Sequence, residues 1–142
     1  MRDQVILRVV SKIAAPFILV FGFYVIAHGE LSPGGGFQGG VVLASAFILY
    51  GLVFGLAELD AIVPRRVTDA LTGAGVLLYL LVGLAGIFGD YRFLDYTPLR
   101  ITGSESAESW GMTLVEYGVG ITVASVMITV YREVSQAGSA EK

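Results

Sequence analysis

Residues 67–88 read VTDALTGAGVLLYLLVGLAGIF, a run of apolar and small residues that holds one charge, Asp69. An α-helix rises about 1.5 Å per residue, so about 20 such residues cross the hydrocarbon core of a bilayer, which is about 30 Å thick. Three further apolar runs have a similar length, at approximately 5–27, 38–57 and 111–131. The sequence therefore predicts an all-α integral membrane protein with four transmembrane helices, in a single domain over residues 1–142.

The composition excludes several other classes of protein. Of the 142 residues, 55% are hydrophobic and 15% are charged, and a water-soluble domain of this size could not bury so much apolar surface. The net charge is −3 and there is no basic cluster beyond Arg65-Arg66, so no nucleic acid is expected as a partner. With no cysteine and one histidine, the chain offers no thiolate or multi-histidine ligand set, and we expect neither a metal nor a cofactor.

The distribution of basic residues predicts the orientation in the membrane, because Lys and Arg are retained on the cytoplasmic side. Arg92 and Arg100 flank the runs on one side, and the other basic residues lie on the opposite side: Arg2, Arg8, Lys12, Arg65, Arg66, Arg132 and Lys142. Both termini are therefore expected in the cytoplasm, in a multi-pass protein of the cell membrane. The loop 89–110 would then face outward and supply interfacial aromatic anchors: Tyr91, Phe93, Tyr96 and Trp110.

The predicted helices carry small residues at helical spacing, which lets helix backbones approach each other closely in a membrane. In the second run Gly36, Gly40 and Ala44 recur every four residues, and the third run is also rich in glycine. Four short helices enclose little volume, so we interpret this surplus of glycine as contact with helices of other chains. The alternative is that membrane helices merely tolerate glycine.

The most distinctive segment is the glycine turn, residues 32–40, which reads SPGGGFQGG and connects the first two runs. It contains the pattern G-x-G-x-x-G, but a dinucleotide site needs a strand before this motif, and here apolar runs of membrane length flank it. Pro33 instead stops the first helix, and the glycines allow backbone angles that are closed to other residues. Phe37 and Gln38 can contact a neighbour, the first by packing and the second by hydrogen bonding.

Residues 28–40 read HGELSPGGGFQGG, which is similar to the signature of the MnhB/MrpB family, the B subunits of multisubunit cation/proton antiporters. The resemblance covers most of the chain, through its size, its four predicted helices and the sequence EYGVG at 116–120. It implies a structural motif or subunit interface made of Pro33, Gly34, Gly35, Gly36, Phe37, Gln38, Gly39, Gly40 and Gly120. Glu30 departs from the family pattern, where a neutral residue or a histidine is frequent.

The resemblance implies a small subunit, and not an enzyme, that packs beside the large subunits of a Mrp-type antiporter. Its expected partners are those subunits and the lipid bilayer, with Na⁺ and H⁺ as the transported ions. Two alternatives stay open: a related subunit in the ion-pumping module of a membrane-bound hydrogenase or kindred respiratory complex, and a purely structural scaffold. The residues themselves also disfavour an enzyme, because no nucleophile, base and orienting group occur together.

Three ionisable side chains are candidates for ion translocation, since a charge inside the membrane is costly and commonly functional. Glu116 shares a helix face with the small residues Gly120 and Ala124, so we expect it to meet another helix, either as a proton or ion ligand or as a structural hydrogen bond. Lys12 either reaches the membrane interface or points toward a proton path. His28 either exchanges protons beside the glycine turn or serves as a polar cap.

Overall fold

The structure is a computed structural model that describes residues 5–29, 34–88, 93–94 and 106–140, with the side chains of the last helix described over 111–138. These residues form five helices and no strand: α1 (Val5–Ala27), α2 (Gly36–Phe54), α3 (Leu56–Ile62), α4 (Arg65–Phe88) and α5 (Ser106–Ala140). All except α3 are long and apolar enough to cross a membrane. The prediction of an all-α protein with four transmembrane helices is confirmed.

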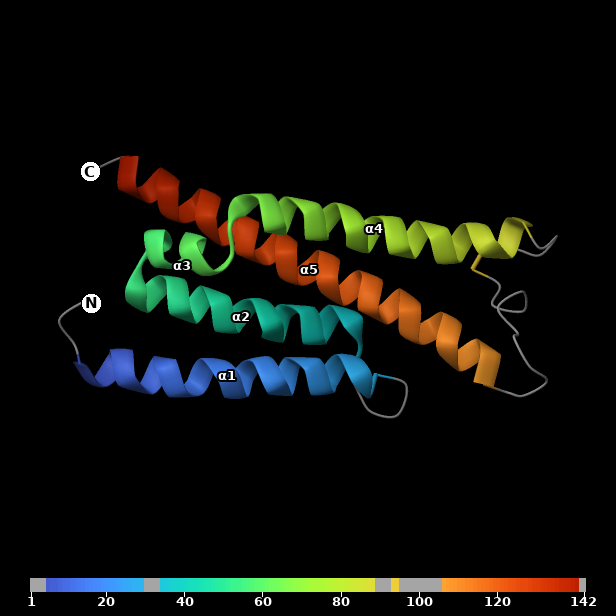
Figure 1. Ribbon diagram of the computed structural model, residues 1–142, viewed down its shortest axis with the longest axis horizontal. Coiled ribbons are helices and arrows are strands. Elements are labelled where there is room, and N and C mark those ends of the chain that lie inside the picture. Colours follow the sequence, from blue (N-terminus) through green and yellow to red (C-terminus); the bar gives the residue numbers. More distant parts are fainter. Residues whose placement is uncertain (1–4, 30–33, 89–92, 95–105, 141–142) are drawn as a thin grey trace.

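The long helices lie side by side in the order α1, α2, α5, α4, so that α2 and α5 form the middle of the molecule (Figure 1). In the most apolar 18-residue stretch of α2, 44% of the residues are buried. The corresponding value for α1 is 17%, because α1 packs mainly against α2 alone. The start of α1 and the end of α5 lie at one end of the molecule, and the α1–α2 turn lies toward the other (Figure 1). That the end with both termini is cytoplasmic stays a prediction.

Glycines set the distance between the helices of this chain. A Cβ at Gly40 of α2 would lie 2.6 Å from the carbonyl oxygen of Gly120, so α2 and α5 touch through their backbones. On α4, a Cβ at Gly75 would lie 2.6 Å from the carbonyl oxygen of Gly118 of α5. At Gly73, in contrast, a Cβ would meet nothing within 4 Å in the described chain. Contacts inside the chain therefore account for several of the glycines that we interpreted as contacts with other chains.

Helix α3 occupies the segment where the sequence predicts only a short charged loop. Gly55 separates it from α2 with a φ of 103°, a backbone angle that favours glycine. Leu59 is fully buried and anchors α3, and a Cβ at Gly51 would lie 3.0 Å from its Cδ2. Leu59 is the buried residue of this seven-residue helix. A single anchor leaves no periodic pattern that could predict a helix from the sequence.

Helix α5 extends beyond the apolar run that predicts it. It has 35 residues, whereas the predicted span covers residues 111–131. Hydropathy detects the part of a helix that suits lipid, while helical hydrogen bonding continues into more polar residues. The limits of the spans within the bilayer therefore stay predictions.

Of the predicted interfacial aromatic residues, Phe93 lies in the described part of the chain. It packs against α4, where a Cβ at Gly83 would lie 3.0 Å from its Cδ2. Tyr91 and Tyr96 lie outside the described residues, as does the side chain of Trp110. Phe93 thus contributes to packing inside the chain.

Candidate functional site

The carboxylate of Glu116 on α5 lies directly on the turn between α1 and α2. A Cβ at Gly29 would overlap the carboxylate oxygens and would lie 2.7 Å from Cδ of Glu116. A Cβ at Gly35 would lie 3.4 Å from Oε1. The structure thus brings Glu116 and the glycine turn together, although the sequence singles them out separately and far apart.

Backbone contacts between α5 and α2 hold Glu116 beside the turn. Its own carbonyl group lies against Gly36, where a Cβ would overlap the oxygen and lie 2.9 Å from Cα of Glu116. One turn further along α5, a Cβ at Gly120 would lie 3.1 Å from the carbonyl oxygen of Gly36. The first amide groups of α2 have no partner within their helix, and their partial positive charge favours a carboxylate nearby. Glu116 is half-buried in this position.

The glycines of the motif on α2 face inward. Gly36, Gly39 and Gly40 are buried. Gly39 lies against α1, where a Cβ would come within 3.0 Å of the carbonyl oxygen of Gly22. These residues join α2 to α1 and α5 of the same chain, which is a structural role. That a partner subunit also contacts the motif stays a prediction.

The other residues of the motif are more accessible. Phe37 and Gln38 are exposed, and 64% of the surface of Phe37 is open. Gly34 and Gly35 are half-buried, and Gly35 has a φ of 146°, within the range that favours glycine. Pro33 lies outside the described residues. Of the described residues of the motif, Phe37 and Gln38 are therefore the most accessible to a partner.

His28 lies in the same turn, immediately before Gly29. Its ring stacks on Tyr24 with the ring centroids 4.3 Å apart, and its Nδ1 lies 3.3 Å from the carbonyl oxygen of Tyr24. The side chain is exposed. The structure therefore brings His28 to the turn that Glu116 contacts, with bonding suited to a polar cap at the end of α1. Proton exchange by His28 stays a prediction.

Lys12 lies near the opposite end of α1. Its Nζ is 5.6 Å from the ring centroid of Phe54, and the guanidinium carbon of Arg8 is 5.1 Å from the same centroid. Both cations are exposed, and the aromatic face attracts them. The structure does not bring Lys12 to Glu116, so a role for Lys12 in a proton path would have to involve a different surface.

A buried arginine on α5 is a charged site that was not predicted from the sequence. Arg132 is only 2% exposed, although by sequence it is a flanking basic residue. Its Nε forms an ion pair with Oδ1 of Asp60 at 2.9 Å, without the geometry of a hydrogen bond. Nη1 donates to Oγ1 of Thr68 at 2.9 Å, and Nη2 donates to the carbonyl oxygen of Val63. Arg132 therefore connects α5 with α3, the α3–α4 connection and α4.

The sequence does contain a signal for this burial. Thr122, Ser125, Thr129 and Arg132 follow one another at spacings of three, four and three residues, which puts them on one face of a helix. The hydroxyl of Ser125 donates to the carbonyl of Ile121, and that of Thr129 to the carbonyl of Ser125. Because these hydroxyl groups form hydrogen bonds within α5, the polar face can be buried against other helices. Arg132 lies on the same face, one turn further along α5.

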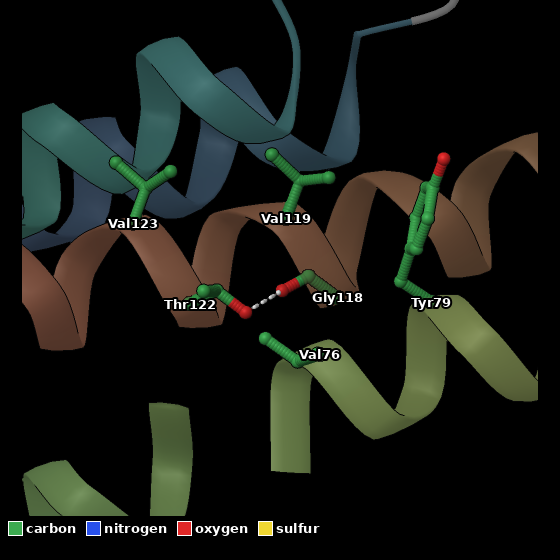
Figure 2. A pocket seen from close by; sticks show the side chains of 6 residues that line it. All are labelled: Val76, Tyr79, Gly118, Val119, Thr122 and Val123. Carbon is green, nitrogen blue, oxygen red and sulfur yellow. Dashed lines mark hydrogen bonds between the residues drawn. The ribbon is translucent and has the colours of Figure 1, made fainter. Parts of the chain in front are cut away.

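A groove of about 220 Å³ lies beside this face, between α4 and α5 (Figure 2). The hydroxyl of Thr122 donates to the carbonyl oxygen of Gly118 at 2.9 Å, so its hydrogen is already used. None of the residues that line the groove is charged; they are Val76, Tyr79, Gly118, Val119, Thr122 and Val123. The groove therefore does not suit a cation. Over the described residues, no three His, Cys, Asp or Glu side chains could hold a metal ion together.

Known proteins resemble this chain over most of its length. The family described as "Domain related to MnhB subunit of Na+/H+ antiporter" matches residues 6–129, which include Glu116 and the glycine turn. A "Putative antiporter subunit mnhB2" of Staphylococcus haemolyticus (strain JCSC1435) is 33% identical over 132 residues, covering 90% of this chain and 92% of the relative.

A relative from Bacillus subtilis (strain 168), named as the B subunit of a Na(+)/H(+) antiporter, is 28% identical over 138 residues, covering 94% of each chain. The relatives thus have nearly the same length as this chain and align with it almost from end to end. The resemblance noted in the sequence is confirmed, and the chain belongs to the MnhB family, the family related to the B subunit of Na⁺/H⁺ antiporters.

Proposed function

We propose that this chain is a subunit of a Mrp-type cation/proton antiporter in the cell membrane, where it helps to form the ion route at its interface with larger subunits. Glu116 is the polar participant in this proposal, and the glycine turn is the backbone that positions it. Family membership supports the role of an antiporter subunit. The finer role rests on the geometry of Glu116.

The contact of the Glu116 carboxylate with Gly29 is the observation that carries the proposal. A carboxylate in a membrane protein can bind a cation or exchange a proton, whereas most other side chains near this turn cannot. Phe37 and Gln38 are exposed on the same turn and are available for a partner subunit. An ion that passes along such an interface would meet Glu116.

Glu116→Gln tests the role of the charge, because glutamine keeps the shape of the side chain but neither binds protons nor carries charge. We expect Na⁺/H⁺ exchange to fall about tenfold or more, since a hydrogen bond to a charged group contributes about 1.5–3 kcal/mol and each 1.4 kcal/mol is a factor of ten. The measurement is Na⁺-dependent dissipation of a pH gradient in membrane vesicles that contain the assembled antiporter, with co-purification of the subunits as the test of assembly.

Glu133→Gln is the matched control, because Glu133 lies on the same helix near its other end and forms an exposed ion pair with Arg65 at 2.5 Å. This variant should transport normally. Unchanged exchange in Glu116→Gln, with the variant present in the assembly, would remove Glu116 from the mechanism.

Gly29→Ala tests the position of the carboxylate while keeping its charge. The added methyl group would occupy the space of the carboxylate oxygens, and the flexible end of Glu116 can move aside at little cost to the fold. We expect a normal amount of assembled protein and an exchange activity reduced in the same direction as in Glu116→Gln. Equal activity of Gly29→Ala and the wild type would show that the contact with Gly29 does not matter for transport.

A scaffold without a role in the ion route is the second candidate, and the exposure of Phe37 favours it. Phe37 is a large apolar side chain that is 64% exposed beside the buried glycines of α2, a position suited to bind a partner subunit. Under this alternative Phe37→Ala prevents assembly, while Glu116→Gln and Gly29→Ala both transport normally. The two candidates therefore differ in the outcome of the same set of variants.

A further inference from the structure

A second groove, distant from Glu116, lies where α1, α2 and α3 meet, and it has a volume of about 190 Å³. Ala15, Leu19 and Phe47 are among the apolar residues that line it. Lys12 and Tyr50 also line it, and they lie toward the start of α1 and the end of α2, which is one end of the groove. One end of the groove therefore carries the polar side chains of Lys12 and Tyr50, and the rest of its lining is apolar.

Two cations lie at the polar end. Arg8 and Lys12 both lie over the ring of Phe54, at 5.1 Å and 5.6 Å from its centroid, and both are exposed. Phe54 is buried, so it provides a fixed platform that keeps the two charges together. They are one helical turn apart on the same face of α1.

Among the residues that the structure describes, no acidic side chain lines the groove to neutralise these cations. The acidic residues of the neighbouring helix α3 are Glu58 and Asp60. Asp60 forms an ion pair with Arg132, and Glu58 is exposed without lining the groove. The pair of cations therefore has positive charge available for an anion at the membrane surface.

We propose that this groove binds an anionic phospholipid, with its phosphate at Arg8 and Lys12 and an acyl chain along Ala15, Leu19 and Phe47. Basic pockets between transmembrane helices recognise anionic headgroups, and each Lys or Arg near the membrane surface attracts an anionic lipid. The charge and the apolar depth of the groove both fit this ligand. The proposal does not depend on a role of Glu116 in transport.

Site-specific photocrosslinking in the assembled antiporter tests the proposal. Phe47→benzoylphenylalanine places an aromatic crosslinker in the groove, and Leu71→benzoylphenylalanine places it on α4, where Leu71 is 41% exposed. The full chain is expressed with its partner subunits in bacteria whose membranes contain phosphatidylglycerol and phosphatidylethanolamine. Mass spectrometry of the adducts then measures the ratio of these two lipids at each position. We expect phosphatidylglycerol to be enriched about tenfold at Phe47 relative to Leu71, given two nearby cations.

The double variant Arg8→Gln/Lys12→Gln should reduce this enrichment to the ratio found at Leu71. The matched control, Arg65→Gln/Arg66→Gln, removes two cations at the same end of the molecule that do not line the groove, and it should leave the enrichment unchanged. Equal loss in both double variants would show that only the overall charge matters and would overturn the proposal. A crosslink from Phe47 to another protein subunit would also overturn it. Leu19→benzoylphenylalanine, which reaches the groove from α1, replaces the Phe47 probe if that variant does not assemble.

Discussion

Replacing Gly36 by alanine is expected to lower the free energy of unfolding by about 3 kcal/mol, at the upper end of the cost of overpacking. The new Cβ would overlap the carbonyl oxygen of Glu116 and lie 2.8 Å from its carbonyl carbon. These atoms belong to the backbone of α5, so no side chain can rotate to make room. Helices α2 and α5 would have to separate, and both form the middle of the molecule. Reversible unfolding in mixed micelles would measure the loss.

Gly73→Ala is the matched control for this prediction. Gly73 is also a helical glycine, but nothing lies within 4 Å of the position that its Cβ would take. Alanine should therefore leave the free energy of unfolding unchanged or raise it by up to about 1 kcal/mol, through its better helix propensity. Similar stabilities of the Gly36 and Gly73 variants would contradict the close backbone contact between α2 and α5.

Replacing Arg132 by alanine is expected to cost about 3 kcal/mol, through the cavity that the buried side chain leaves and the loss of its hydrogen bonds. The substitution removes the guanidinium group of α5 that donates hydrogen bonds to the hydroxyl oxygen of Thr68 and to the carbonyl oxygen of Val63. It also leaves a cavity where a fully buried side chain was. The helix pair α4 and α5 should then separate first near this end, which amide hydrogen exchange of residues 63–68 would detect as faster exchange.

Arg65→Ala provides the comparison, because Arg65 belongs to an ion pair in the same region that is open to water. Its side chain is 56% exposed and that of its partner Glu133 is 52% exposed. Exposed pairs contribute about 0–1 kcal/mol, so this variant should be close to the wild type in the free energy of unfolding. If the Arg65 and Arg132 variants lose the same amount, the buried position of Arg132 does not matter for stability.

The class of the protein and its family follow from the amino-acid sequence alone. Apolar runs such as 67–88 predict membrane helices because only a helix satisfies every backbone hydrogen bond in lipid, and the bilayer thickness sets its length. Residues 28–40 indicate the MnhB family, since thirteen consecutive residues of an unusual composition are specific. Glu116 was identified as a candidate because charge is rare within such runs.

Which residues meet, in contrast, depends on how the helices are arranged in space. Glu116 contacts Gly29, and Arg132 contacts Asp60, although each pair is far apart along the chain, and helical periodicity carries information only within one helix. Arg132 and Lys12 are both basic residues near the ends of apolar runs, and hydropathy alone does not distinguish them. One is buried and the other lies exposed on Phe54, because the position of a neighbouring helix determines whether a basic side chain reaches water or an internal partner.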